Sequence, residues 1–231
     1  MMNSPSLTPA DWPGAVNAWQ VRPGLWRMGR AEWVEREGWE AMARDGVGAV
    51  VDLRLPNETP RSDIDPDDVQ VPASIRRIAA PVEDADHREY RELAVPYVNH
   101  PRLYADLVGF FPQKVARALR IILDEWRDGG VVVHCSAGRD RTGLATAMLL
   151  QLDDVPGGAA DWEEQRGNYA TGVLGMNEFW RTTTLTHPHE RYLDDDQLGP
   201  LLEERLEALR VFLADWPGDR VARLIETGEL L

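Results

Sequence analysis

Residues 131–143 read VVVHCSAGRDRTG and contain the only cysteine of the 231-residue chain, Cys135. The three valines at the start are typical of a strand that is buried on both faces. Residues 144–152 are apolar on nearly every side, which indicates a buried helix. A strand, a short loop and a helix in this order place Cys135 at the carboxyl end of a strand, where α/β proteins bind ligands.

The loop between this strand and this helix has the features of an anion site. A short loop that runs into a helix N-terminus directs backbone N–H groups toward one point. Gly138 permits the left-handed turn or close backbone approach that such a loop needs. The planar guanidinium of Arg141 can donate two parallel hydrogen bonds to an anion. The predicted phosphate-binding residues are Ser136, Ala137, Gly138, Arg139, Asp140 and Arg141.

Cys135 is the predicted nucleophile, at the bottom of this loop. A helix dipole and a nearby arginine stabilise a thiolate. A thiolate below a bound phosphate can attack the phosphorus atom in line, and water then hydrolyses the cysteinyl-phosphate. We expect Thr142 to donate a hydrogen bond to the sulfur and His134 to order the loop. The alternative is a buried structural cysteine, because cysteine is often buried, but it does not explain the residues around Cys135.

Apolar periodicity elsewhere indicates helices that alternate with short strands. The expected strands are 25–28 (at a sheet edge), 49–53 and, with a weaker pattern, 74–79. The expected helices are 31–44, 105–126 and 198–212, with another beginning at Pro156. This alternation predicts an α/β fold, in which a central and mostly parallel sheet is flanked by helices.

No stretch of the sequence is convincing as a linker, so we expect a single domain over residues 1–231. Residues 1–24 are rich in Pro, Gly and Trp, and are expected to form an irregular N-terminal arm. Residues 156–231 are expected to form a helical C-terminal part packed on the domain, because the apolar stripe of helix 198–212 needs burial. The sequence leaves the oligomeric state open.

The composition argues against several classes of partner. A net charge of -14 argues against nucleic-acid binding and against an anionic membrane surface. One cysteine rules out an internal disulfide and a multi-cysteine metal site, and His187 and His189 lack accompanying ligands for a metal. We expect no cofactor. No stretch approaches 18 consecutive apolar residues, so membrane insertion is not expected. Without a leader pattern at the first residues, we expect a cytoplasmic protein, with leaderless export as the alternative.

The loop at residues 134–143, HCSAGRDRTG, resembles the signature loop of the cysteine-based protein tyrosine phosphatases. It is most similar to the bacterial family whose loop reads His-Cys-x-Ala-Gly-Lys-Asp-Arg-Thr-Gly, which includes atypical, lipid-phosphatase-like members. Residues 22–27 and 50–54 with Glu58 resemble the N-terminal half of that family. The resemblance implies the phosphatase fold and hydrolysis of phosphotyrosine, phosphoserine/threonine or phosphoinositides.

Two positions depart from this family pattern. The usual opening motif is present only as Asn17, and the loop lysine is replaced by Arg139. The replacement keeps the charge but changes a point contact into a planar fork, which leaves activity on polyphosphorylated lipids open. We expect Arg139 to face the substrate.

Departure of a phenolate or alkoxide requires a general acid. The bacterial family assigns this role to the aspartate within the loop, here Asp140, and like charge beside a bound phosphate favours its protonated form. In most of the superfamily the acid is instead an aspartate on a separate loop, which corresponds to Asp84 or Asp86 here. Asp52 and Arg54 end a predicted central strand, and we expect them to form an ion pair that supports the site.

Four functions are compatible with this reading. The favoured one is a protein tyrosine phosphatase, which would extend to dual specificity if phosphoserine and phosphothreonine also fit. The alternative is the same chemistry on a phosphoinositide or a small phosphate ester. A rhodanese-type sulfurtransferase also uses a loop cysteine, and a non-catalytic phosphate-binding module is the fourth possibility. The partner in the favoured readings is therefore a phosphorylated protein or a phosphoinositide.

Overall fold

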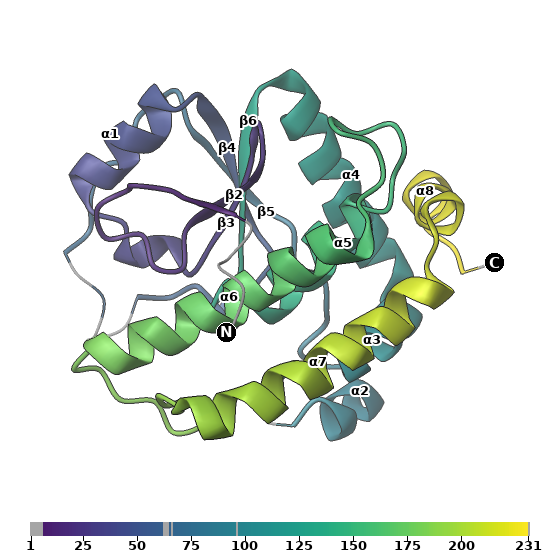
Figure 1. Ribbon diagram of the computed structural model, residues 1–231. Helices are drawn as coiled ribbons and strands as arrows, with labels where there is room; N and C mark the ends of the chain where they lie inside the picture. Colours follow the sequence, from purple (N-terminus) through teal and green to yellow (C-terminus); the bar gives the residue numbers. More distant parts are fainter. Residues whose placement is uncertain (1–6, 62–64, 66, 96, 231) are drawn as a thin grey trace.

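A central sheet organises the chain, as seen in the computed structural model, which describes residues 7–61, 65, 67–95 and 97–230 (Figure 1). Within these residues the sheet has six strands in the order β1-β2-β3-β6-β4-β5. The strands are β1 (Thr8–Pro9), β2 (Trp19–Arg22), β3 (Leu25–Met28), β4 (Val47–Asp52), β5 (Arg76–Ala79) and β6 (Gly130–His134). β3, β6, β4 and β5 are parallel, whereas β1 and β2 are antiparallel. The predicted mixed α/β class is confirmed.

Helices cover both faces of the sheet. The helix α1 (Arg36–Arg44) lies on one face, and the remaining helices lie on the other side (Figure 1). They are α2 (Arg88–Leu93), α3 (Tyr104–Phe110), α4 (Pro112–Asp128), α5 (Asp140–Leu149), α6 (Trp162–Thr182), α7 (Asp195–Asp215) and α8 (Gly218–Thr227). Alternation along β6 explains the two layers: Val132 packs in the core beneath α1, and Val131 and Val133 pack in the core on the opposite face.

The parallel register brings four strand ends to one edge of the sheet. His134 of β6 pairs with Met28 of β3 and with Asp52 of β4, and Asp52 pairs in turn with Ala79 of β5. The segments that follow these strands therefore emerge side by side. The loop that begins at Cys135 is at the centre of this edge, in agreement with the predicted position.

The N-terminal segment differs from the prediction. Residues 1–6 of the expected irregular arm lie outside the described residues, but β1 and β2 both fall within residues 7–24. β2 and β3 form a hairpin through Pro23 and Gly24, and Gly24 has a φ of 80°. A proline followed by a glycine is typical of a tight turn, so these two residues indicate a hairpin in the sequence. β3 was expected at the edge of the sheet. It is instead a fully buried interior strand, because β2 pairs with it on one side and β6 pairs with it on the other.

Helix boundaries also differ from the prediction. The helix expected over 31–44 is divided into a 3₁₀ helix, Ala31–Trp33, and α1, which begins at Arg36. The helix expected over 105–126 is broken at Phe111 (φ -130°, ψ 49°) into α3 and α4, because Pro112 keeps the preceding residue out of the helical region. Pro156 does not begin a helix. It enters a turn with two left-handed glycines, and α6 instead begins after Asp161, whose side chain accepts a hydrogen bond from Glu164 N at 2.9 Å.

The C-terminal helices pack against the earlier elements. α7 contacts α6 and the short 3₁₀ helix Pro101–Leu103, and α8 contacts α4. The apolar stripe of α7 is buried in these contacts; its members include Leu198, Leu202, Leu206, Leu209 and Phe212. Among the described residues, no helix has both the length and the apolar character needed to span a bilayer.

Candidate active site

The loop after β6 folds into a tight turn around Cys135. Gly138 adopts the left-handed conformation predicted for it, with a φ of 65°. A Cβ atom at this position would lie 2.1 Å from the carbonyl oxygen of Met28, which ends β3. Glycine is therefore required twice, by its backbone angle and by the close approach of the neighbouring strand. The loop ends where α5 begins at Asp140, with the helix N-terminus at the site.

Two buried side chains hold the loop from behind. The guanidinium of Arg27 is fully buried and donates to Gly138 O at 2.7 Å and to Asn168 Oδ1 at 2.7 Å. Asn17 Nδ2 donates to Ala137 O at 3.0 Å. These contacts satisfy carbonyl groups on the outer side of the loop, and a loop bonded in this way leaves its N–H groups available to an anion.

Arg141 is held by two glutamates at the mouth of the loop. Its Nη1 and Nη2 donate to Glu58 at 2.5 and 2.7 Å, and Nη1 also donates to Glu83 at 3.0 Å. Ser136 Oγ donates to the same Glu58 carboxylate at 3.2 Å. All these contacts use the two terminal nitrogens of the guanidinium. Within the described residues, Nε of Arg141 has no protein acceptor.

The two glutamates differ in their acidity. Burial alone would raise the pKa of Glu58, but its hydrogen bonds and ion pair with Arg141 exceed this effect and lower the pKa. Burial dominates at Glu83 and raises its pKa, although the charge of Arg141 opposes the shift. Glu58 is therefore the firmly ionised partner of the arginine, and Glu83 holds its proton more readily.

Arg139 and Asp140 form a second buried charge cluster. Arg139 Nε donates to Asp140 Oδ2 at 2.8 Å, and its Nη1 and Nη2 donate to the carboxylate of Glu190 at 3.0 and 2.9 Å. On its other side, Asp140 lies 3.4 Å from Nη1 of Arg205, which belongs to α7. Arg139 was expected to face the substrate; it does border the cavity at Cys135, but its three donor groups are engaged with carboxylates.

A cavity of about 320 Å³ opens above Cys135. Cys135, Ser136, Ala137, Arg139, Asp140 and Arg141 line its base. Aromatic and apolar side chains form most of its remaining walls: Trp33, Tyr97, Val98, Met176, Trp180 and Leu185. The site thus combines a thiol, the two loop arginines, a third arginine at Arg30 and an enclosure that is mostly apolar. Among the described residues, no group of His, Cys, Asp and Glu side chains could hold a metal ion.

Comparison with known families agrees with this site. A family model described as the tyrosine phosphatase family matches residues 12–216. The chain belongs to the tyrosine phosphatase family. It is therefore a cysteine-based phosphoric monoester hydrolase, in agreement with the function that the sequence favours.

Individual relatives are more distant. No curated protein matches the chain. Among solved structures, the crystal structure of TpbA from P. aeruginosa is similar, at 18% identity over 92% of this chain and 99% of that chain, with a TM-score of 0.42. A cysteine-to-serine variant of TpbA in complex with phosphotyrosine has the same identity and coverage and a TM-score of 0.46.

The candidate general acids of this phosphatase occupy different places. Asp140 borders the cavity of Cys135, whereas Asp84 and Asp86 border an adjoining cavity on the far side of Arg141. Asp84 accepts a hydrogen bond from Asp86 N at 3.1 Å and pairs with Lys114 at 3.7 Å; these contacts lower its pKa. Asp86 is exposed.

The supporting residues of the phosphatase loop behave in part as expected. The ring of His134 is buried, which lowers its pKa, and Nδ1 lies 3.1 Å from Cys135 O. A neutral imidazole with its proton on Nδ1 would donate there, in agreement with an ordering role. Thr142 Oγ1 is buried without a hydrogen-bond partner among the described residues, so the expected hydrogen bond to the sulfur is not formed.

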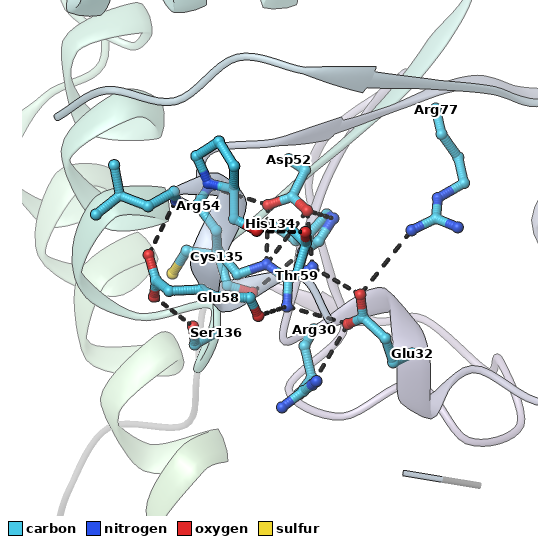
Figure 2. A network of polar contacts seen from close by, with 12 residues as sticks. Arg30, Glu32, Asp52, Arg54, Glu58, Thr59, Arg77, His134, Cys135 and Ser136 are labelled. Carbon is cyan, nitrogen blue, oxygen red and sulfur yellow. Dashed lines mark hydrogen bonds and ion pairs between the residues drawn. The ribbon is translucent and has the colours of Figure 1, made fainter. Parts of the chain in front are cut away.

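An ion network supports the neighbouring strand end (Figure 2). Arg54 is buried and donates to Asp52 Oδ2 and to Glu32 Oε1, both at 2.7 Å. The predicted Asp52–Arg54 ion pair is therefore present. Arg54 Nη1 also reaches Glu58 O at 3.4 Å, which connects the network to the partner of Arg141. Although burial opposes ionisation of Asp52, its electrostatic interaction with the His134 ring and its hydrogen bonds and ion pair with Arg54 bring its pKa to about 2.

Several residues of the site were missed in the sequence. Glu83 immediately precedes Asp84, in the loop that carries two of the candidate general acids. Its position next to these residues indicates that it could lie near the site. Glu32, Glu190 and Arg205 come from three separate segments. Each is one charged side chain in a segment with several other charged residues. No local pattern distinguishes it from those neighbours.

Proposed function

We propose that this phosphatase hydrolyses phosphotyrosine in proteins, with Cys135 as its nucleophile. The observation that supports this substrate is the cavity above Cys135. Its walls carry Trp33, Tyr97 and Trp180, which suit an aromatic ring, and its base carries the anion-binding loop. A phosphorylated phenol combines the two features, with a ring for the walls and a dianion for the base.

The proposed reaction has two steps. The Cys135 thiolate attacks phosphorus, a sulfur–phosphorus bond forms, and the bond from phosphorus to the phenolic oxygen breaks. The departing oxygen takes a proton from the general acid. Water then attacks the cysteinyl-phosphate and gives a proton to the ionised general acid, which restores it; the sulfur–phosphorus bond breaks, and inorganic phosphate and the thiolate are released. Arg141 and the loop amides of residues 136–141 hold the phosphoryl oxygens in both steps.

We propose Asp140 as the general acid, because it borders the same cavity as Cys135 while Asp84 and Asp86 do not. In Asp140→Asn, kcat for phenyl phosphate should fall by about a hundredfold, and the alkaline fall of the pH–rate profile should disappear. Asp84→Asn is the matched control and should retain both. The opposite pattern would move the acid to the separate loop.

The activity is tested with a phosphotyrosine peptide and with p-nitrophenyl phosphate. Both should be hydrolysed, vanadate should inhibit, and Cys135→Ser should lower kcat by at least about a thousandfold. A panel of phosphotyrosine peptides, phosphoserine/threonine peptides and soluble phosphoinositides then ranks the substrate classes. A phosphoinositide with the highest kcat/KM would refute the protein substrate, and equal rates on both peptide types would make the enzyme dual-specific.

We further propose that residues 1–231 act as one phosphatase domain. The packing of α7 on α6, and the contact of Arg205 with Asp140, support this view, because the C-terminal part contributes directly to the loop. A cytoplasmic location is also proposed, since reducing compartments keep a free catalytic thiol from oxidising into disulfides. Fractionation with antibody detection tests the location.

A further inference from the structure

The second arginine of the loop is occupied by protein carboxylates. Arg139 is 7% exposed, and its Nε, Nη1 and Nη2 all donate to carboxylate oxygens within 3.0 Å. Asp140, its neighbour in the sequence, takes one of these bonds. The other two go to Glu190, which lies 51 residues away in the sequence and meets the arginine in a bidentate pair.

Glu190 is held in place by contacts of its own. It lies in the connection of residues 183–194 between α6 and α7, at the lower left of Figure 1. Tyr97 donates its hydroxyl to Glu190 Oε1 at 2.8 Å. Further along, Asn177 of α6 exchanges two hydrogen bonds with the backbone of Leu193, at 3.0 and 2.9 Å. The connection, which forms part of the cavity wall, is thus held at two points: at Glu190 by Tyr97 and at Leu193 by Asn177.

The charge of Glu190 is stable at neutral pH. Burial opposes its ionisation, but the hydrogen bonds from Arg139 and Tyr97 and the charge of Arg139 lower its pKa overall. Arg141 is paired differently, because Glu58 and Glu83 contact only its terminal nitrogens and leave its Nε edge to the loop. Of the two loop arginines, Arg141 therefore keeps its Nε for a ligand, whereas all three nitrogens of Arg139 donate to carboxylates.

We propose that Glu190 is a specificity-determining residue, which restricts the cavity to substrates with one phosphate at their reacting end. The proposal rests on the phosphomonoesterase function proposed above. On the side of the cavity that Glu190 borders, a second phosphate beside the first would approach Arg139, which borders the same cavity. There it would meet an arginine whose charge is already paired with two carboxylates, and the negative charge of Glu190, so it would be repelled rather than bound.

Removal of the Glu190 charge should shift binding toward the ligand with two phosphates. In Glu190→Gln the side chain keeps its shape, but Arg139 loses its ionised bidentate partner and can turn two donors toward a second phosphate. The test compares two ligands on one scaffold, an inositol with one ring phosphate and an inositol with two adjacent ring phosphates. Binding is measured by calorimetry in the Cys135→Ser background, so that no turnover is needed.

The expected result is a change in the ratio of the two dissociation constants. Glu190→Gln should tighten the bisphosphate relative to the monophosphate by at least about tenfold. Glu178→Gln is the matched control and should leave the ratio unchanged, since Glu178 also pairs with an arginine, Arg181, but is exposed and outside the cavity. Adding Arg139→Met to Glu190→Gln should abolish the gain.

Three results would overturn the proposal: an unchanged ratio in Glu190→Gln, equal tightening of both ligands, or no bisphosphate binding at all. Equal tightening would show a steric barrier rather than a charge effect. Thermal melting checks that Glu190→Gln is folded. If it is not folded, Tyr97→Phe replaces it, and a smaller change in the same ratio of dissociation constants is expected. An unchanged ratio in Tyr97→Phe would refute the proposal. Failure of the proposed function is seen separately, as a wild-type enzyme that does not hydrolyse phosphotyrosine.

Discussion

Replacement of Asp52 by asparagine tests the ion network beneath the active-site loop. The carboxylate has a pKa of about 2 in the folded protein, against an ordinary value of 3.8. A tenfold change in acidity corresponds to about 1.4 kcal/mol, so the charged form of Asp52 stabilises the fold by about 2 kcal/mol at neutral pH. Asp52→Asn preserves the shape of the side chain but leaves Arg54 with Glu32 as its remaining carboxylate, and should cost that amount.

The pH dependence follows from the lowered pKa of Asp52 in the folded protein. Because the folded pKa is depressed, the unfolded chain takes up the proton first as the pH falls. The stabilisation is therefore complete above a pH of about 5, and is lost as the pH falls through the folded value of about 2. The variant has no carboxyl group to titrate at this position. The stability difference between wild type and variant should therefore shrink by roughly 1 kcal/mol between pH 7 and about pH 3.

Urea unfolding followed by circular dichroism measures both effects. The control is Asp68→Asn, whose carboxylate pairs with Arg61 at the surface and is 82% exposed; it should change the free energy of unfolding by less than about 0.5 kcal/mol. Equal unfolding midpoints for Asp52→Asn and wild type at pH 7 would refute the reasoning. So would a stability difference that does not respond to acid, since it would arise from packing rather than charge.

Three further substitutions probe the loop. Gly138→Ala should lower kcat/KM by at least about tenfold and destabilise the fold by about 2 kcal/mol, because the new Cβ would meet the Met28 carbonyl and the left-handed backbone would be strained; both are measured on the purified variant. Arg27→Met should cost about 3 kcal/mol in urea unfolding and reduce turnover, since it removes the donor to Gly138 O; unchanged turnover would refute its role in shaping the loop. Glu83→Gln should become more stable relative to wild type in urea unfolding as the pH rises from about 4 to 7. The reason is that the pKa of Glu83 is raised in the folded protein, so its ionisation destabilises the fold. A trend of the opposite sign would show that its pair with Arg141 outweighs burial.

The loop was predictable because its chemistry is local. Between His134 and Gly143, the spacing of residues determines which backbone and side-chain groups can surround one anion, and the flanking strand and helix are visible from apolar periodicity alone. The left-handed turn at Gly138 and the position of Cys135 at a strand end followed from that order. The turn at Pro23 and Gly24 and the break at Pro112 are equally local, because each follows from a proline that interrupts an otherwise continuous apolar pattern.

The partners of the loop arginines were not predictable in the same way. Glu190 and Arg205 lie 51 and 65 residues from the loop residues that they contact. The chain has 39 acidic residues, and nothing in the local sequence distinguishes the few that turn inward. Only the packing of α6 and α7 selects them. Periodicity predicted that α7 has a buried face, but not that Arg205 on this face reaches the carboxylate of Asp140.

The overall acidity of the protein and its phosphate-binding chemistry are compatible because the site does not rely on net positive charge. Arg139 and Arg141 are outnumbered by the carboxylates that contact them: Glu58, Glu83, Asp140 and Glu190. A bound phosphate dianion would add further negative charge to this cluster. Binding must therefore come from short, directed hydrogen bonds in the loop. Burial already raises the pKa of Glu83, so among these carboxylates Glu83 most easily keeps a proton, which would offset the charge that the phosphate adds.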